Sequence, residues 1–345
     1  MNASIRKVGV VLLAMFLALM LNSTYAYVFR TESLNNAPQN RRVTDAEFNT
    51  DRGAILVGNA AIATTKPIED GYGFQRSYPQ RPLYAPVTGY YSPLYKRSGL
   101  EQTQNAQLSG TSNSQFMQRL VDLATGKRPV GASVVTTLDA RAQQAAWDAL
   151  AGRPGAVVAL DYSTGAVKAL VSSPSYDPNL LATHDNNAAQ ASWKDLNADT
   201  AKPLSNRATR EIFPPGSTFK LIVSATALAS GMTPDTVVDA PATLPLPGSS
   251  RPLSNSGDCG GTSIPLKQAL ATSCNTAFAG LGMKLGQDAV RAQAAKFGFG
   301  SGDELPQLGA AKSNFPASLD AAQLAQSSIG QFDVAATPLQ MAMVG

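Results

Sequence analysis

One serine and one lysine, Ser217 and Lys220, stand three positions apart at the start of an apolar segment. Residues three apart on a helix share a face, so the hydroxyl and the amine would be neighbours. Apart from Lys220, residues 217–230 carry no charge, which is typical of a helix inside a domain. Burial disfavours the ammonium form, and a neutral lysine can take the proton of a serine. The pair predicts a serine nucleophile that needs no histidine; the alternative is a lysine that reaches the surface.

The Ser-x-x-Lys pattern alone does not identify a catalytic pair, because it also occurs at Ser4 and Lys7 by chance. The residues around Ser217 and Lys220 provide the further evidence. Ser217 directly follows a Pro-Pro-Gly turn, which is a helix-start signal. We expect a helix from Ser217 to Ser230, closed by Gly231. The first backbone N–H groups of such a helix can face a developing oxyanion.

A second hydroxyl and an amide, Ser273 and Asn275, stand at the junction between two expected helices. Ser273 can relay a proton and Asn275 can bind a peptide amide, provided that both flank the same pocket as Ser217. Taken alone, Ser-x-Asn indicates no more than ordinary helix capping.

The first thirty residues predict export. Arg6 and Lys7 precede an uncharged stretch, residues 8–29, that is long enough to cross a bilayer as a helix. Its strongly apolar part, residues 8–21, also suits a signal peptide cleaved after Ala26. Both alternatives keep the two cations inside and place the rest of the chain outside the cytoplasm.

Composition excludes several classes of function. The 345 residues allow about two domains, and the net charge of +4 comes without any Lys/Arg run, so we expect no nucleic-acid partner. With one histidine and two cysteines, we expect no metal site and no cofactor. His184 stands in a polar stretch and is expected at the surface. Cys259 and Cys274 form a disulfide, or else remain two unpaired buried residues.

The chain divides into two regions of different character. Residues 30–128 are rich in Pro and Tyr and then in polar residues, which indicates an irregular domain that contains β-structure. Beyond them we expect a strand at 134–138, a helix capped by Asp139 and a hairpin of strands 156–160 and 167–171. This order predicts an α+β domain with an antiparallel sheet.

Together, these motifs resemble the class B penicillin-binding proteins, and within them an actinobacterial type. The Pro-Pro-Gly-Ser-Thr-Phe-Lys and Ser-Cys-Asn-Thr-Ala-Phe motifs carry the resemblance, and it covers nearly the whole chain. Further similar segments are Asp51–Gly53, Thr137–Asp139, Gly155–Leu160, Ser163–Gly165, Ser173–Asn179, Ser328–Gln331 and Thr337–Met341.

The resemblance implies an architecture. Residues 1–29 would be a cytoplasmic tail with an uncleaved membrane anchor, and 30–128 a pedestal or dimerisation domain. Residues 129–345 would form a penicillin-binding transpeptidase domain of the serine β-lactamase-like fold. The protein would be a single-pass protein of the cell membrane with its catalytic part outside the cytoplasm.

The resemblance also implies roles and partners. Ser217 would attack the D-Ala-D-Ala bond of a peptidoglycan stem peptide, with Lys220 as base, Ser273 as proton shuttle and Asn275 as substrate-amide anchor. An amine of a neighbouring stem would resolve the acyl-enzyme, and β-lactam antibiotics would acylate the same serine. A glycan polymerase of the shape or division machinery is the expected protein partner.

One departure from the family pattern concerns the third motif, Lys-Ser/Thr-Gly, which does not occur between Ser273 and Gly345. We therefore expect the sequence to be a fragment that lacks the C-terminal part of the domain, and to be inactive as it stands. Two alternatives remain. A β-lactamase or carboxypeptidase would use water as the acceptor, and a non-catalytic β-lactam sensor or cell-wall assembly scaffold would rely on residues 30–128.

Overall fold

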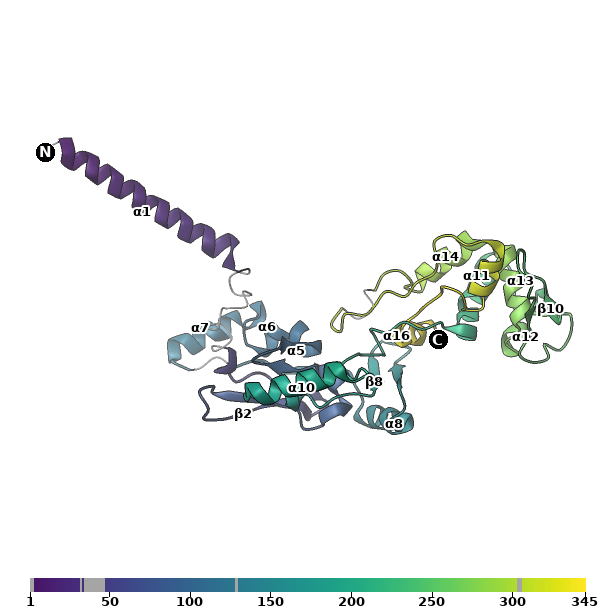
Figure 1. Cartoon of the computed structure of the whole chain (residues 1–345), viewed down its shortest axis with the longest axis horizontal. Coiled ribbons are helices and arrows are strands. Elements are labelled where there is room, and N and C mark those ends of the chain that lie inside the picture. Colours follow the sequence, from purple (N-terminus) through teal and green to yellow (C-terminus); the bar gives the residue numbers. More distant parts are fainter. Residues whose placement is uncertain (1–2, 32, 34–46, 128–129, 303–305) are drawn as a thin grey trace.

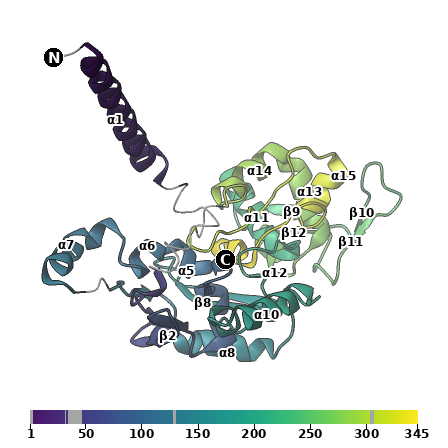
Figure 2. The same cartoon turned by 60° about the vertical axis from the view of Figure 1, so that its left-hand side comes forward.

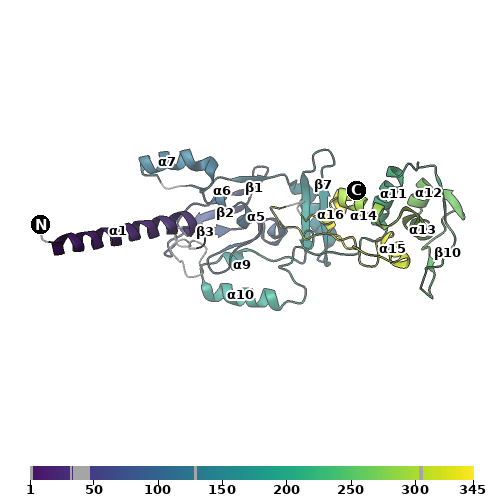
Figure 3. The ribbon, with the colours of Figure 1, turned by 90° about the horizontal axis from the view of Figure 1, so that it is seen from above.

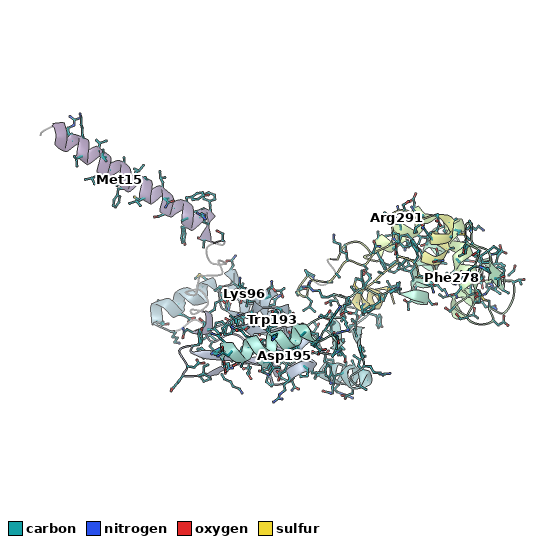
Figure 4. The ribbon with its side chains drawn as sticks, in the orientation of Figure 1. Met15, Lys96, Trp193, Asp195, Phe278 and Arg291 are labelled. Atoms are coloured by element: carbon teal, nitrogen blue, oxygen red, sulfur yellow. A yellow bond between two sulfur atoms is a disulfide. The ribbon has the colours of Figure 1, made fainter. Side chains whose placement is uncertain are left out.

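The computed structural model describes residues 3–31, 33, 47–127, 130–302 and 306–345. Figure 1 shows an elongated molecule with helix α1 (Ala3–Phe29) at one end and a helical lobe at the other. Within Arg6–Phe29 of α1, the most apolar stretch of 18 residues has a mean hydropathy of 2.0, and none of it is buried. Met15, labelled in Figure 4, is 60% exposed. This helix is long and apolar enough to span a bilayer.

A four-stranded sheet follows, in the order β3-β2-β1-β6. Its strands are β1 (Ile55–Val57), β2 (Ala60–Pro67), β3 (Phe74–Ser77) and β6 (Val134–Thr136). β1 pairs antiparallel with β2 and parallel with β6. The strand that we expected to open the second domain therefore completes the sheet of the first. The expected boundary at 128–129 lies outside the described residues.

Short elements surround this sheet and form, with it, the region that we call the pedestal. They are η1 (Arg81–Leu83), α4 (Ala85–Thr88), β4 (Tyr91–Ser92), β5 (Lys96–Arg97), α5 (Gly99–Thr103), α6 (Asn105–Leu108), η2 (Asn113–Gln115) and α7 (Phe116–Thr125). Strands β4 and β5 make a separate antiparallel pair.

A buried charge cluster joins the segments of the pedestal. The Glu101 carboxylate accepts from Arg52 Nε and Arg76 Nε, each at 2.7 Å, and from the Tyr78 hydroxyl at 3.1 Å. The three charged side chains are at most 3% exposed. Buried charges persist only when they are paired and hydrogen-bonded, and the Glu101 carboxylate pairs with both guanidinium groups at once.

The predicted helix and hairpin follow the pedestal sheet. Helix α8 (Ala140–Leu150) begins at Asp139, whose side chain accepts two backbone N–H groups of the first turn. Strands β7 (Gly155–Leu160) and β8 (Val167–Ser173) pair antiparallel, as predicted. Gln143 on α8 is buried and bonds to the backbone of β8 through both its amide atoms.

The prediction for His184 was wrong. It lies between α9 (Asn179–Ala182) and α10 (Asn186–Ala198), and only 7% of its side chain is exposed. Its Nδ1 lies 2.8 Å from Asp70 Oδ2, and its ring packs against Phe48 and Tyr72. A neighbouring carboxylate and two aromatic rings allow this polar residue to be buried, although its sequence neighbours are polar.

The remaining elements form the helical lobe and its connections. They are η3 (Gly216–Phe219), α11 (Lys220–Ala229), β9 (Val237–Asp239), β10 (Thr243–Leu244), β11 (Leu253–Ser254), β12 (Ser263–Pro265), α12 (Leu266–Ala271), α13 (Asn275–Leu285), α14 (Gln287–Lys296), α15 (Ala321–Ser327) and α16 (Pro338–Val344). Figure 3 shows α11–α15 gathered toward the end away from α1, with α16 near β7. Figure 2 shows α11, α13, α14 and α15 together in one lobe.

The lobe has its own apolar core. Phe219, Ile222 and Phe278 are fully buried in it, and Phe278 is labelled inside the lobe in Figure 4. The ring of Phe219 stacks on that of Phe315, with 5.7 Å between centroids. Because Phe219 lies between Ser217 and α11, this packing fixes the position of the candidate nucleophile.

Candidate active site

The candidate nucleophile, Ser217, has an exposed side chain in the 3-10 turn η3, which runs directly into α11. We predicted an α-helix from Ser217 itself; the structure has one tighter turn first, a common arrangement at helix N-termini. Gly231 follows the end of α11 with a positive φ of 93°, as expected of a glycine that closes a helix.

A glycine that the sequence analysis left without a role supports the turn before Ser217. Gly216 N donates to Gly330 O at 2.9 Å. A Cβ atom on Gly330 would lie 2.1 Å from Gly216 O, and Gly330 has a φ of +71°. Only glycine combines this close approach with this conformation. The signal was available, because Gly330 stands within the quoted segment Ser328–Gln331.

Lys220 is fully buried, so the alternative of a surface lysine was wrong. Its Nζ lies 2.7 Å from both Ser273 O and Asn275 Oδ1. The same nitrogen lies 3.0 Å from Ser273 Oγ and 3.1 Å from Ser217 Oγ. The structure thus brings all four predicted residues into one hydrogen-bonded cluster.

The surroundings of Lys220 change its chemistry. Desolvation by burial lowers the pKa of its amine from 10.5 to about 8. The ring of Phe278 lies 5.8 Å from Nζ and forms part of the apolar wall. Near neutral pH, about a tenth of the molecules therefore carry the neutral amine that a general base requires.

The hydrogen-bonding capacity of the four oxygens around Lys220 Nζ also fits a neutral amine. The Ser273 carbonyl and the Asn275 amide oxygen can only accept, so they take two N–H groups of Lys220. A neutral amine has two N–H groups and one lone pair. The lone pair is then left for a hydroxyl proton, and both hydroxyls are within hydrogen-bond distance.

Ser273 has a backbone conformation that is unusual for its residue type. Its φ is +56°, in the left-handed region that glycine favours. It follows the end of α12, where Ser273 N donates to Leu270 O and Cys274 N to Ala269 O, the pattern of a Schellman turn. This turn places both the carbonyl and the hydroxyl of Ser273 against Lys220. Strained non-glycine residues of this kind cluster at functional sites.

Cys274 lies between the two residues of the second motif and forms a disulfide with Cys259. Of the two alternatives for the cysteines, the structure has the bonded one. The bond ties the second motif to the loop that follows β11.

Among the described residues, no group of three or more His, Cys, Asp or Glu side chains is placed to hold a metal ion. A buried amine beside an exposed hydroxyl is an arrangement that can perform nucleophilic acyl transfer.

Two protein families match the chain. Residues 155–344 match the penicillin binding protein transpeptidase domain, and residues 52–134 match the penicillin binding protein A dimerisation domain. The first match contains all four cluster residues. The second includes Arg52 of the buried charge cluster and reaches the start of β6.

Individual relatives agree with these matches. The chain is similar to the peptidoglycan D,D-transpeptidase PbpA of Mycobacterium tuberculosis strain H37Rv, with 44% identity over 352 positions that cover 100% of this chain and 72% of the relative. The PbpA of Mycolicibacterium smegmatis is similar to the same extent. The peptidoglycan D,D-transpeptidase MrdA of Acinetobacter baumannii is 31% identical, covering 78% of this chain and 45% of the relative.

Solved structures show the same fold. The crystal structure of M. tuberculosis PBPA has a TM-score of 0.81 and 44% identity, covering 85% of this chain and 69% of that one. Its ceftriaxone acyl-enzyme complex has a TM-score of 0.82 and 43% identity, covering 86% and 68%. The family and the fold predicted from the motifs are confirmed: this chain belongs to the penicillin-binding protein transpeptidases.

Proposed function

We propose that this chain is a peptidoglycan D,D-transpeptidase in which Ser217 is the acylated nucleophile. One observation carries the proposal: a buried lysine nitrogen lies 3.1 Å from an exposed serine oxygen, with its N–H groups directed to two carbonyl oxygens. The names of the relatives supply the substrate class. Proximity and a lowered lysine pKa supply the activation.

In the acylation step, Ser217 Oγ attacks the carbonyl carbon of the D-Ala-D-Ala bond while Lys220 Nζ takes its proton. The oxyanion that forms is stabilised by the backbone N–H of Ser217, which has no partner within the helix, whereas the N–H of Gly216 is already bonded to Gly330 O. When the C–N bond breaks, the leaving amine needs a proton. Ser273 Oγ lies 3.0 Å from Nζ and can pass that proton from Lys220 to the amine.

In the second step, an amine of a neighbouring stem peptide attacks the ester carbon. Lys220, neutral again, takes the proton of this amine through Ser273, and Ser217 recovers its hydrogen when the ester bond breaks. The result is one new amide bond and an unchanged enzyme. A β-lactam offers the same carbonyl in a strained ring, so it would acylate Ser217 by the first step.

The side-chain amide of Asn275 has an N–H group left to bind substrate, in addition to its contact with Lys220. Its Nδ2 donates one N–H to Ser254 O at 3.2 Å. An amide nitrogen has two N–H groups, so the second is available to a carbonyl of the stem peptide. Asn275 would therefore bind substrate and hold Lys220 at the same time.

We further propose the cellular arrangement that the sequence predicted. Residues 1–29 would anchor the chain in the cell membrane by a single span. Residues 30–128 would form the pedestal domain, with β6 of the following segment completing its sheet, and residues 129–345 would form the transpeptidase domain, both outside the cytoplasm. The position of α1 and the helical lobe at opposite ends supports a catalytic site held away from the membrane (Figure 3). The pedestal would bind a glycan polymerase.

The test compares wild type with Ser217→Ala, each expressed from its complete reading frame. Fluorescent penicillin should label the wild type and leave the variant unlabelled, and the variant should not replace the wild-type gene in growing cells. If Ser217→Ala supports growth fully, the protein acts as a scaffold. If it still takes the label, Ser217 is not the acylated residue.

A further inference from the structure

Helix α13 begins at Asn275 of the second motif, and the residue that precedes it does not cap it. The residue in the N-cap position is Cys274, whose sulfur is bonded to Cys259 and makes no cap hydrogen bond. The cap comes from a distant residue instead: Asn255 Oδ1 accepts from Thr276 N at 2.9 Å. An oxygen acceptor at this place satisfies a backbone N–H that otherwise has no partner in the helix.

The other amide atom of Asn255 is also engaged. Asn255 Nδ2 donates to Pro241 O at 3.2 Å and to Thr276 Oγ1 at 3.0 Å. Thr276 Oγ1 in turn donates to Pro241 O at 2.7 Å, and Thr276 is 1% exposed. This closed network defines which end of the Asn255 amide faces the helix.

The residue before Asn255 orients the second motif directly. Ser254 O accepts from Asn275 Nδ2 at 3.2 Å. A carbonyl can only accept, so the NH₂ end of the Asn275 amide must face Ser254 and its oxygen must face away. That oxygen is the one that lies 2.7 Å from Lys220 Nζ.

We propose that Asn255 is a positioning residue for acyl transfer, which caps α13 in place of Cys274 and so keeps the Asn275 amide oxygen on Lys220. The proposal rests on the proposed function of the Ser217 and Lys220 pair. Asn255 touches neither of them; it acts through Thr276 and through the adjoining Ser254 carbonyl. The Cys259–Cys274 disulfide attaches the same loop to the motif at a further point.

The experiment measures the rate of acylation by fluorescent penicillin between pH 6 and pH 9.5, in the protein expressed from its complete reading frame. Asn255→Ala should slow acylation by about 10- to 100-fold, the size expected when a catalytic group is misplaced by about 1 Å. The pKa that governs the rate should fall, because Lys220 loses an acceptor that stabilises its ammonium form. Asn255→Asp keeps an oxygen for Thr276 N but loses the N–H that Pro241 O accepts, so it should recover part of the lost rate.

The matched control is Asp185→Ala, which removes a cap of the same kind from α10, in a different part of the molecule. It should lower the Tm to a similar degree as Asn255→Ala and leave the acylation rate and its pH profile unchanged. If Asn255→Ala does not fold, Asn255→Ser takes its place, because a serine side chain is too short to reach Thr276 N and the same slowing is expected.

Two outcomes overturn the inference, and they differ in what else they overturn. If the wild type is labelled, Ser217→Ala is not, and Asn255→Ala or Asn255→Ser is labelled at the wild-type rate with the same pH profile, Asn255 has no positioning role. If the wild type takes no label at all, the proposed function fails together with the inference.

Discussion

Lys220 Nζ lies 2.7 Å from the Ser273 carbonyl oxygen, although 53 positions separate the two residues in the sequence. The contact depends on the left-handed conformation of Ser273 at the end of α12. A carbonyl can only accept, so this contact fixes the direction of one N–H of the lysine. It thereby helps to direct the lone pair of the neutral amine toward the serine hydroxyls.

The acylation rate should depend on the protonation of Lys220. Its pKa is lowered by burial to about 8, and the neutral amine is the active form. The rate should therefore rise about tenfold per pH unit below pH 8 and level off above it. Stopped-flow measurement with a fluorescent penicillin between pH 6 and pH 9.5 checks this, and a rate constant that does not change over that range would exclude Lys220 as the base.

Arginine at position 220 should separate the charge of the lysine from its basicity. An arginine side chain keeps a cation near Ser217 but cannot lose its proton in a protein. Lys220→Arg and Lys220→Met should both lower the acylation rate by about 100- to 10,000-fold, the usual contribution of a general base. Their far-UV circular dichroism should match the wild type. Substantial activity in Lys220→Arg would show that the positive charge, not proton transfer, matters.

Substitutions at Ser273 should separate the effect of its strained backbone on stability from the effect of its hydroxyl on the acylation rate. Ser273→Gly and Ser273→Ala both remove the hydroxyl, and each should slow acylation by about 100-fold or more if Ser273 relays the proton. Only glycine is free of strain at a φ of +56°. Ser273→Gly should therefore be more stable than Ser273→Ala by about 1 kcal/mol in urea denaturation. Equal stability of the two variants would contradict the strain at this position.

The buried cluster of the pedestal should be sensitive to the loss of its one carboxylate. Glu101→Gln leaves two buried guanidinium groups without a counter-charge and should cost about 3–5 kcal/mol in the free energy of unfolding. Asp235→Asn is the matched control, because its ion pair with Lys267 is exposed on both sides and should contribute less than about 1 kcal/mol. Urea denaturation of both variants measures the difference, and equal effects would contradict the assigned role of burial.

The same cluster predicts how stability depends on pH. Burial alone would raise the pKa of Glu101, but the guanidinium groups of Arg76 and Arg52 outweigh it and hold the pKa below 4.5. A carboxylate with a lowered pKa in the folded state stabilises the fold above its unfolded pKa and loses this contribution as the pH falls through the folded pKa. The stability advantage of wild type over Glu101→Gln should therefore be full at pH 7 and shrink below about pH 4.5. An advantage that is constant from pH 7 to pH 3 would contradict this assignment.

The sequence by itself determined the family, the chemistry and much of the local structure. Ser217 and Lys220 are three positions apart, so helical geometry alone makes them neighbours. Asp139 as a cap and the β7–β8 hairpin were likewise predictable, because capping and strand alternation depend on nearby residues. The apolar stretch of α1 was visible for the same reason.

Only the tertiary structure decided the contacts between segments far apart in the chain. The sequence could not place β6 beside β1, bury His184 against Asp70, or direct Asn255 to the start of α13. These pairings depend on which surfaces meet after the chain has folded, and short polar residues such as Asn or His can serve as caps, surface groups or buried partners equally well. The lysine that defines the site is an example: its sequence position gave one oxygen neighbour, and folding supplied the other three.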